Sequence, residues 1–264
     1  MEKTTQVVRV PDGATLERIV RDLGNFTVAL FGVDRIAGHF CGSGTLVSVA
    51  NCHCILTAAH VWQYLKLYPG IQITVKEKVD HSFRIARDTI VPTGTIEPDE
   101  GWGEWGPDLC FLLLPPHRAS SIEAYKIFYN LDKRREQVGD YQWWALMGTP
   151  ESEGIFTDRY ADFRITGSFL GVIGQHDKDG LDYLDIGVDL SLPGAPPSFS
   201  GVSGGGLWRI TFTESSSGLW TWDYVLKGVA FYQSPVIEGH RFVRCHGPKS
   251  IQNLIPVVPT GQTG

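Results

Sequence analysis

Hydrophobic residues recur at every second position in several short segments, which is the pattern of half-buried β-strands. In the segment 181–190, Leu184, Ile186, Val188 and Leu190 alternate strictly with other residues. Further short apolar runs are bounded by turn-forming residues, so the chain is predicted to be built mainly from strands. The predicted strands are 26–32, 38–48, 54–57, 71–77 and 109–114 in the first half, and 141–147, 164–173, 181–190, 206–213 and 222–232 in the second.

Three short segments are predicted to be helical. Near the N-terminus, apolar residues fall at i, i+3, i+4 and i+7 and a glycine follows as a stop signal. These residues are Leu16, Ile19, Val20, Leu23 and Gly24. The other two segments are a helical turn over 58–65 and a closing helix over 248–254. The N-terminal helix either packs on the strands or binds a partner, and the sequence leaves both roles open.

Composition narrows the class of protein. A chain of 264 residues suffices for one large all-β domain or two small ones, and 30 glycines with 15 prolines favour short strands joined by turns. The net charge is −6 and no basic stripe is visible, so nucleic acid is not expected as a partner. The apolar run 109–114 is far too short to span a bilayer, and the first residues contain no apolar segment of secretory length. The sequence therefore predicts a cytoplasmic protein with no membrane partner.

Three separated blocks carry the residue types of a serine hydrolase. His60 follows two alanines, Asp108 begins an apolar strand, and Ser203 lies among the glycines of 201–205. A serine hydroxyl needs a base within hydrogen-bond reach, and that base needs an orienting carboxylate. The chain order His, Asp, Ser, with gaps of 48 and 95 residues, differs from the orders of subtilisins and α/β-hydrolases.

These blocks resemble the trypsin/chymotrypsin-like serine protease family, in particular its bacterial-type intracellular members. Thr57-Ala58-Ala59-His60 matches the histidine block, and 108–113 is similar to the strand that begins with the aspartate. The segment 201–205 is similar to the nucleophile loop G-D-S-G-G, and 39–47 to the strand pair before the histidine. The resemblance runs from about Phe26 to about Leu254.

The resemblance implies an all-β fold of two packed six-stranded antiparallel β-barrels, chymotrypsin-like, with a short C-terminal helix. The expected division is an N-terminal extension with a short helix over 1–24, an N-terminal barrel over 25–130, and a C-terminal barrel with the closing helix over 131–264. The active site would lie in the cleft between the barrels.

The resemblance also assigns roles to individual residues. Ser203 would be the nucleophile, His60 the general base and then acid, and Asp108 the group that orients the histidine. The backbone N–H groups of Gly201 and Ser203 would form the oxyanion hole. The substrate pocket would be made by Pro197, at its floor, and by Phe231, Tyr232 and Gln233 along its wall. A side chain at Gln233 would narrow this pocket, which favours a small or apolar residue before the cut.

Two departures from the family pattern bear on regulation and on redox state. Val202 replaces the aspartate that pairs with a freshly cut N-terminus in secreted members, so activation by N-terminal cleavage is not expected. Control is instead expected from a protein partner or from the loops 101–107 and 191–200. Val61 replaces the usual disulfide partner of the Cys41 position, and Phe199 stands at another paired position. The five cysteines are therefore expected to be reduced.

No cofactor or metal is expected. Cys52-His53-Cys54 could suggest a metal site, but no second Cys/His pair follows at zinc spacing. The leading hypothesis is a serine endopeptidase that cleaves protein or peptide substrates through an acyl-enzyme intermediate, with room for a regulatory protein partner. The alternative is a catalytically silent trypsin-like module that binds a peptide or protein partner. An esterase using the same three residues is a third interpretation.

Overall fold

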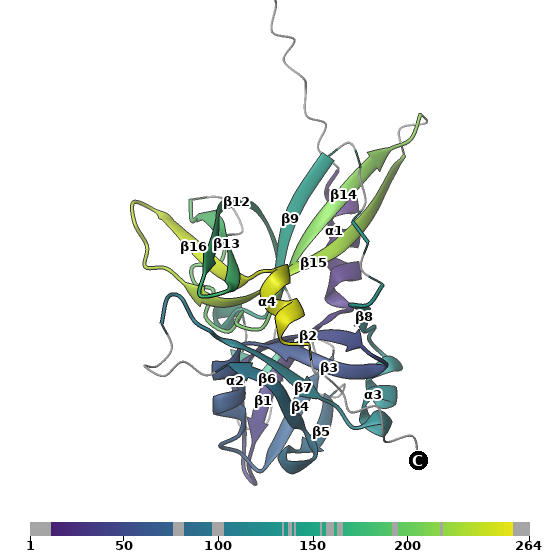
Figure 1. Cartoon of the computed structure of the whole chain (residues 1–264), viewed down its shortest axis with the longest axis vertical. Coiled ribbons are helices and arrows are strands. Elements are labelled where there is room, and N and C mark those ends of the chain that lie inside the picture. The colour runs from purple at the N-terminus through teal and green to yellow at the C-terminus, as the bar shows by residue number, and fades with distance from the viewer. Residues whose placement is uncertain are drawn as a thin grey trace, which may run out of the picture.

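A computed structural model shows two β-units, one formed by each half of the chain (Figure 1). It describes residues 12–75, 82–96, 103–133, 135–136, 139, 141–153, 155–156, 161–162, 166–191, 195–216 and 219–255. The predicted strand 71–77 lies partly outside the described residues, as do parts of the predicted strand 164–173 and of the loops 101–107 and 191–200.

The first unit is a sheet of eight strands. Seven of them follow the order β5-β4-β1-β2-β3-β7-β6 with antiparallel neighbours, and β8 adds to β2 in parallel. Their bounds are β1 Thr27–Val33, β2 Gly38–Val49, β3 Cys52–Thr57, β4 Gly70–Thr74, β5 Ser82–Ala86, β6 Val91–Ile96, β7 Leu109–Leu113 and β8 Tyr129–Asn130.

The second unit is a closed barrel of six antiparallel strands, in the order β12-β13-β16-β15-β14-β9. Their bounds are β9 Tyr141–Gly148, β12 Thr166–Lys178, β13 Leu181–Asp189, β14 Gly206–Glu214, β15 Trp220–Gln233 and β16 His240–His246. A small hairpin of β10 Ile155–Phe156 and β11 Ala161–Asp162 stands apart from it. The alternating segment 181–190 is the strand β13, whose Ile186 and Val188 are buried.

Four α-helices accompany the strands in the described residues: α1 Gly13–Gly24, α2 Ala59–Leu65, α3 Pro116–Glu123 and α4 Pro248–Asn253. Short 3-10 turns occur at Arg87–Thr89 and Glu151–Glu153. The predicted all-β fold of two antiparallel units with a short C-terminal helix is confirmed. The first unit has eight strands instead of the expected six, and β5, β6 and β8 were not among the strands predicted from the apolar pattern.

Three large hydrophobic clusters and one small one occur among the described residues. One large cluster fills the first unit around Leu30, Ile55 and Leu112 and also includes Tyr183 and Phe231 of the second unit. Another lies inside the second unit, around Ile186 and Leu207. The third joins the units, because it contains residues of α1, β2, β3, β7, β9, β14, β15 and α4. Its members include Ile19, Leu23, Val47, Leu56, Phe111, Met147, Trp208, Ile210, Val229 and Ile251. The relative position of the two units is therefore fixed by apolar burial along their seam.

The helix α1 is part of this seam. Asp12 caps it by accepting the Thr15 N–H at 2.7 Å, and Ile19 and Leu23 are fully buried. The predicted amphipathic helix is thus present, and its apolar face packs on the strands. Trp222 of β15 donates to Asp22 at 3.2 Å and Arg18 lies over the Trp222 ring, which ties the polar side of α1 to the second unit.

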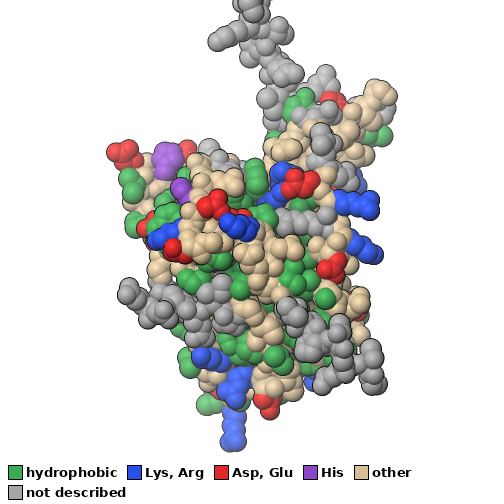
Figure 2. Space-filling model, viewed as in Figure 1, with side chains coloured by type: hydrophobic (Ala, Val, Ile, Leu, Met, Phe, Trp, Pro, Cys, Tyr) green, Lys and Arg blue, Asp and Glu red, His purple; other side chains and the backbone are tan. Residues whose placement is uncertain are grey.

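On the face seen in Figure 2, neither basic nor acidic side chains dominate the surface. Lys and Arg side chains are scattered among acidic ones there and do not gather into a continuous patch. No helix among the described residues is long and apolar enough to cross a membrane.

Because α1 fills the seam, shortening its buried face should destabilise the whole fold. We predict that Ile19→Ala lowers the free energy of unfolding by about 2–5 kcal/mol, the usual cost of deleting a fully buried aliphatic side chain. Denaturant unfolding measures this directly. Glu17→Ala, at an exposed position of the same helix, is the matched control and should change the value by less than about 0.5 kcal/mol. Equal effects of the two substitutions would show that α1 does not contribute to the core.

Candidate active site

His60 is placed by the junction between β3 and α2. Residues Thr57 and Ala58 are extended and fully buried, and α2 begins at Ala59. Val61 and Trp62 anchor the helix in the core of the first unit. Only 18% of the His60 side chain is exposed, at the edge of a cavity. The apolar strand thus delivers the imidazole to the surface on a rigid support.

Asp108 meets His60 from the neighbouring strand. Its carboxylate precedes β7 and is 2% exposed. Oδ1 accepts the backbone N–H of His60 at 2.9 Å, and Oδ2 lies 2.5 Å from the ring Nδ1. A buried carboxylate is costly unless it is hydrogen-bonded, and His60 supplies both partners. With Nδ1 as the donor, the other ring nitrogen, Nε2, is left as an acceptor toward the cavity.

Ser203 lies in a turn that only glycine allows. Gly201 and Gly204 have φ angles of +86° and +89°. A Cβ at Gly201 would lie 2.7 Å from Thr149 O, and one at Gly204 would lie 2.0 Å from Ser43 O. The backbone therefore turns sharply on both sides of the serine and packs tightly against the strand β2.

Polar residues of the first unit hold this turn in place. Ser43 donates its backbone N–H to Ser203 O and its hydroxyl to Gly201 O, both at 2.8 Å. The hydroxyl of Ser43 accepts the N–H of Thr149 at 2.9 Å, and Thr45 donates to Gly204 O at 3.1 Å. A serine of the second unit is thus fixed relative to a histidine of the first.

The N–H groups of the turn fall into two sets. Those of Val202, Gly204 and Gly205 donate to backbone carbonyls at 2.7–3.0 Å. In the part of the chain that the structure describes, those of Gly201 and Ser203 have no intramolecular acceptor. The two N–H groups expected to form an oxyanion hole are therefore not used by the bonds that hold the turn together among the described residues.

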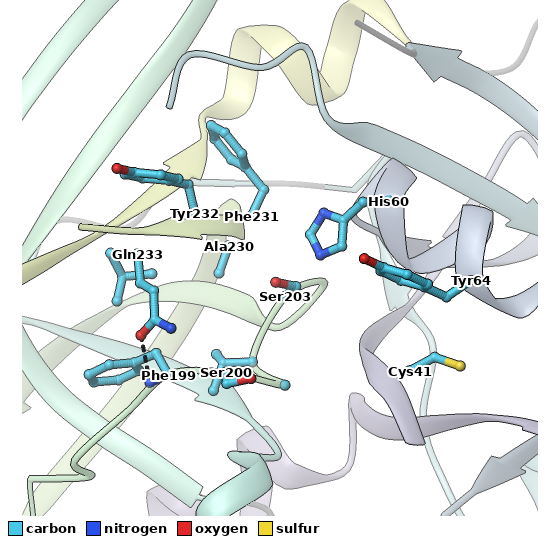
Figure 3. Close-up of a pocket in the computed structure, with 13 residues that line it drawn as sticks. Cys41, His60, Tyr64, Phe199, Ser200, Ser203, Ala230, Phe231, Tyr232 and Gln233 are labelled. Atoms are coloured by element: carbon cyan, nitrogen blue, oxygen red, sulfur yellow. Dashed lines mark hydrogen bonds between the residues drawn. The ribbon is translucent and has the colours of Figure 1, made fainter. Parts of the chain in front are cut away.

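His60 and Ser203 line the same cavity, which has a volume of about 320 Å³ (Figure 3). In the close-up, the Ser203 hydroxyl lies on the side of the His60 ring that faces the cavity. No hydrogen bond joins the Ser203 hydroxyl to the His60 ring among the described contacts. Such bonds are often long before substrate binds. The remaining lining residues are Cys41, Tyr64, Phe199, Ser200, Gly201, Val202, Ala230, Phe231, Tyr232, Gln233 and Val243.

The predicted pocket residues separate into two groups. Phe231, Tyr232 and Gln233 line the cavity as expected, but Pro197 is exposed and does not. A turn in which the Val202 N–H donates to Phe199 O at 3.0 Å lies beside the cavity, and Phe199 lines it. The structure thus does not bring Pro197 to the cavity, whose lining includes Phe199 and Val243.

Gln233 reaches across the cavity from β15. Its Oε1 accepts the N–H of Phe199 at 2.9 Å, the contact drawn in Figure 3, and Nη1 of Arg241 at 2.5 Å. Its Nε2 lies 3.3 Å from the hydroxyl of Ser198. These contacts hold the amide between the two walls of the cavity, which limits the space available beside Ser203.

Val202 is 3% exposed and belongs to the apolar cluster of the second unit. The turn is supported from outside by Glu151, whose backbone N–H donates to Ser200 O and whose carboxylate accepts the Ser200 hydroxyl, both at 2.8 Å. The nucleophile turn is thus held by side chains and backbone groups of the folded chain.

The described part of the loop before Asp108 is tied down rather than free to move. Arg244 is only 3% exposed and pairs with the Asp185 carboxylate through Nε at 2.7 Å and Nη2 at 2.8 Å. Its Nη1 donates to the backbone carbonyl of Glu104 at 3.1 Å and to the Glu104 carboxylate at 3.0 Å. Its guanidinium lies 3.6 Å from the ring centroid of Trp105, whose carbonyl accepts the Tyr183 hydroxyl at 2.6 Å. These contacts hold the described residues of the loop against β13 and β16, and control of the site by this loop stays a prediction.

A second histidine, His246, contacts Asp108 from the other unit, and sequence reasoning did not single it out. It is fully buried, and its Nε2 accepts the backbone N–H of Asp108 at 3.0 Å. Burial lowers the pKa of His246 to about 4, while the carboxylates of Asp108 and Asp182 act in the opposite direction. The ring is therefore neutral near pH 7, with its proton on Nδ1.

The described residues contain five free cysteines: Cys41, Cys52, Cys54, Cys110 and Cys245. Burial raises the pKa of Cys41 to about 11, so the thiol at the cavity is protonated near neutral pH. No group of three or more His, Cys, Asp or Glu residues in the described part of the chain is arranged to hold a metal ion.

Comparisons with known proteins do not assign a family. No protein-family profile and no curated protein matches the sequence. Among 85 matching solved chains is one from work on "Aromatic interactions drive the coupled folding and binding of the intrinsically disordered Sesbania mosaic virus VPg protein". It aligns with 13% identity and a TM-score of 0.45, over 84% of this chain and 85% of that chain.

The neutral, buried state of His246 gives a pH dependence of stability. Between pH 6.5 and about 4, the His246 ring binds a proton in the unfolded chain but not in the folded chain. The contribution of His246 to the free energy of unfolding is therefore complete above pH 6.5 and is lost as the pH falls toward 4. The free energy of unfolding of the wild type should fall between about pH 7.5 and pH 5. We predict that His246→Gln makes this fall smaller by about 2 kcal/mol. Denaturant unfolding at both pH values measures it.

The control is His240→Gln, at the exposed start of the same strand. It should keep the wild-type pH dependence. If both substitutions leave the slope unchanged, His246 is not the buried neutral group that the geometry indicates.

Proposed function

We propose that this chain is a serine endopeptidase of the trypsin-like type. One observation carries the proposal: the buried Asp108 carboxylate binds both the backbone and the ring of His60, and that ring shares a cavity with Ser203. The three residues come from distant parts of the sequence, as the predicted nucleophile, base and orienting carboxylate require.

The proposed reaction follows from these positions. Nε2 of His60 takes the proton of Ser203 while Oγ attacks the scissile carbonyl carbon, and the carbonyl oxygen becomes an oxyanion. The N–H groups of Gly201 and Ser203 donate to this oxyanion. His60 then gives the proton to the leaving amine, which forms the acyl-enzyme. Water, activated by the same ring, hydrolyses the ester and restores the serine. Asp108 holds the tautomer that makes both proton transfers workable.

The site is proposed to be preformed in the uncut chain. Ser43, Thr45 and Glu151 supply the bonds that hold the nucleophile turn. Burial of Val202 in an apolar cluster excludes an ion pair at that position. Cleavage near the N-terminus would also remove or disturb α1, which is part of the core. Control by a protein partner therefore fits this chain better than activation by trimming.

The cavity supports a small or apolar residue before the cut. Phe199, Ala230 and Val243 give it an apolar lining, and the Gln233 amide crosses it. No acidic side chain is among the lining residues, so the usual basis for an Arg or Lys preference is missing.

The reducing environment of the cytoplasm is proposed as the place of action. Cys41 is a free thiol beside the cavity, and the residue after the histidine, Val61, is fully buried in the first unit. The other four cysteines are free as well. The fold thus relies on apolar burial in place of disulfides.

We predict that Ser203→Ala lowers the rate of peptide-bond cleavage by a factor of at least about 10⁴, because nucleophile and base act as one unit. The variant should still fold. Purified full-length protein is incubated with an unfolded protein mixture, and mass spectrometry identifies the new termini. Cleavage is expected after small or apolar residues.

Ser191→Ala is the matched control, since Ser191 is exposed and bonds only to its neighbour Asp189 in the described contacts. Undiminished cleavage by folded Ser203→Ala would overturn the proposal. Ester hydrolysis with no new peptide termini would favour the esterase. No turnover of either substrate, with retained peptide binding, would favour the silent binding module.

A further inference from the structure

The contact between His246 and Asp108 links the second β-unit to the group that orients His60. His246 ends β16 and is 0% exposed. Its Nε2 accepts the backbone N–H of Asp108 at 3.0 Å. The carboxylate of Asp108 binds the ring of His60. Hydrogen bonds thus connect His60 at the cavity, through Asp108, to His246 in the core.

The ring of His246 is held in one orientation. It stacks on Phe231, with centroids 4.4 Å apart and planes 26° apart, and it lies 5.1 Å from the ring of Tyr183. Gly106 also lies close to the ring edge, since a Cβ there would lie 3.2 Å from Nε2 and 2.9 Å from the Asp108 nitrogen. The two aromatic rings hold the plane of the imidazole, and its Nε2 meets the Asp108 N–H at 3.0 Å.

The backbone of His246 is fixed as well. It pairs with Tyr183 of β13 and with Val229 of β15. The next residue, Gly247, donates its N–H to Asp182 O at 2.8 Å, and the Asp182 carboxylate accepts the N–H and hydroxyl of Ser250 at 2.6 and 2.7 Å. The start of α4 is thereby fastened to β13 directly beside His246.

We propose that His246 is a positioning residue for the triad, an inference that rests on the proposed peptidase function. Asp108 follows a loop in which Gly106 takes a φ of +48°, so its backbone has no regular strand pairing on that side. The bond to His246 fixes the Asp108 backbone, and through it the direction of the carboxylate that sets the tautomer and angle of His60. A neutral imidazole is suited to this role, because a protonated ring would present a second donor to the Asp108 N–H.

The test compares three variants of the full chain. His246→Phe keeps an aromatic ring against Phe231 but lacks the acceptor, whereas His246→Gln keeps an acceptor. His246→Phe should lower kcat by about 10- to 100-fold with little change in KM, since small misplacements of catalytic groups cost this much. His246→Gln should recover part of the loss. His240→Gln, at the far end of β16, should leave kcat unchanged.

A spectroscopic measurement separates positioning from a merely structural role. The proton between His60 Nδ1 and Asp108 should give a far-downfield ¹H resonance in the wild type and in His240→Gln, and it should shift or vanish in His246→Phe. In ¹⁵N-histidine-labelled wild type, His246 should be the Nδ1–H tautomer with an unprotonated Nε2.

Each outcome decides the matter. An Nε2–H tautomer of His246, or a folded His246→Phe variant that keeps both kcat and the downfield proton, would overturn the proposal. If His246→Phe does not fold, the tautomer of the wild type and the behaviour of His246→Gln still decide it. If the wild type cleaves no peptide, the proposed function fails, while the NMR measurements still show whether His246 positions the Asp108–His60 pair.

Discussion

The constraint on which the site depends is the burial of the Asp108 carboxylate. An ionised group that is only 2% exposed is tolerated when hydrogen bonds replace the lost water. The backbone and ring of His60 supply these bonds to the two carboxylate oxygens. The backbone N–H of Asp108 donates to Nε2 of His246. Asp108 is thereby connected to both β-units. A change in the packing of the two units would therefore change the position of the His60 imidazole.

The two units are joined at the site by polar bonds and elsewhere by apolar burial. Ser43 and Thr45 of β2 bind the turn that carries Ser203. Away from the cavity, α1 and α4 contribute Ile19, Leu23 and Ile251 to a cluster shared by both units. Apolar burial thus joins the units along the seam, and polar bonds hold the turn with Ser203 against β2. A site assembled from both units is in this way supported without a disulfide among the described residues.

Local patterns predicted the parts of the molecule whose cause is local. Strict alternation around Ile186 predicted β13, and the i, i+3, i+4 spacing of Leu16, Ile19, Val20 and Leu23 predicted α1. His60, Asp108 and Ser203 could be selected because each stands in a short block that resembles a block of the trypsin-like family, in the same order along the chain.

Features that depend on the path of the chain in space could not be predicted in this way. The family resemblance implies Pro197 as the pocket floor, but a resemblance between sequence blocks cannot show that the turn brings Phe199 to the cavity instead. His246 looked like an ordinary histidine, because its contacts with Asp108 and Phe231 join residues far apart in sequence.

The central claim is that Asp108 and His60 activate Ser203, and covalent labelling tests it most directly. Full-length protein is treated with a fluorophosphonate, and the adduct is located by mass spectrometry of the digested protein. The account predicts a single adduct on Ser203, formed on the order of 10⁴ times more slowly in Asp108→Asn, because the asparagine favours the wrong tautomer of His60. An unlabelled Ser203 in folded wild type, or labelling at the same rate in Asp108→Asn, would contradict it.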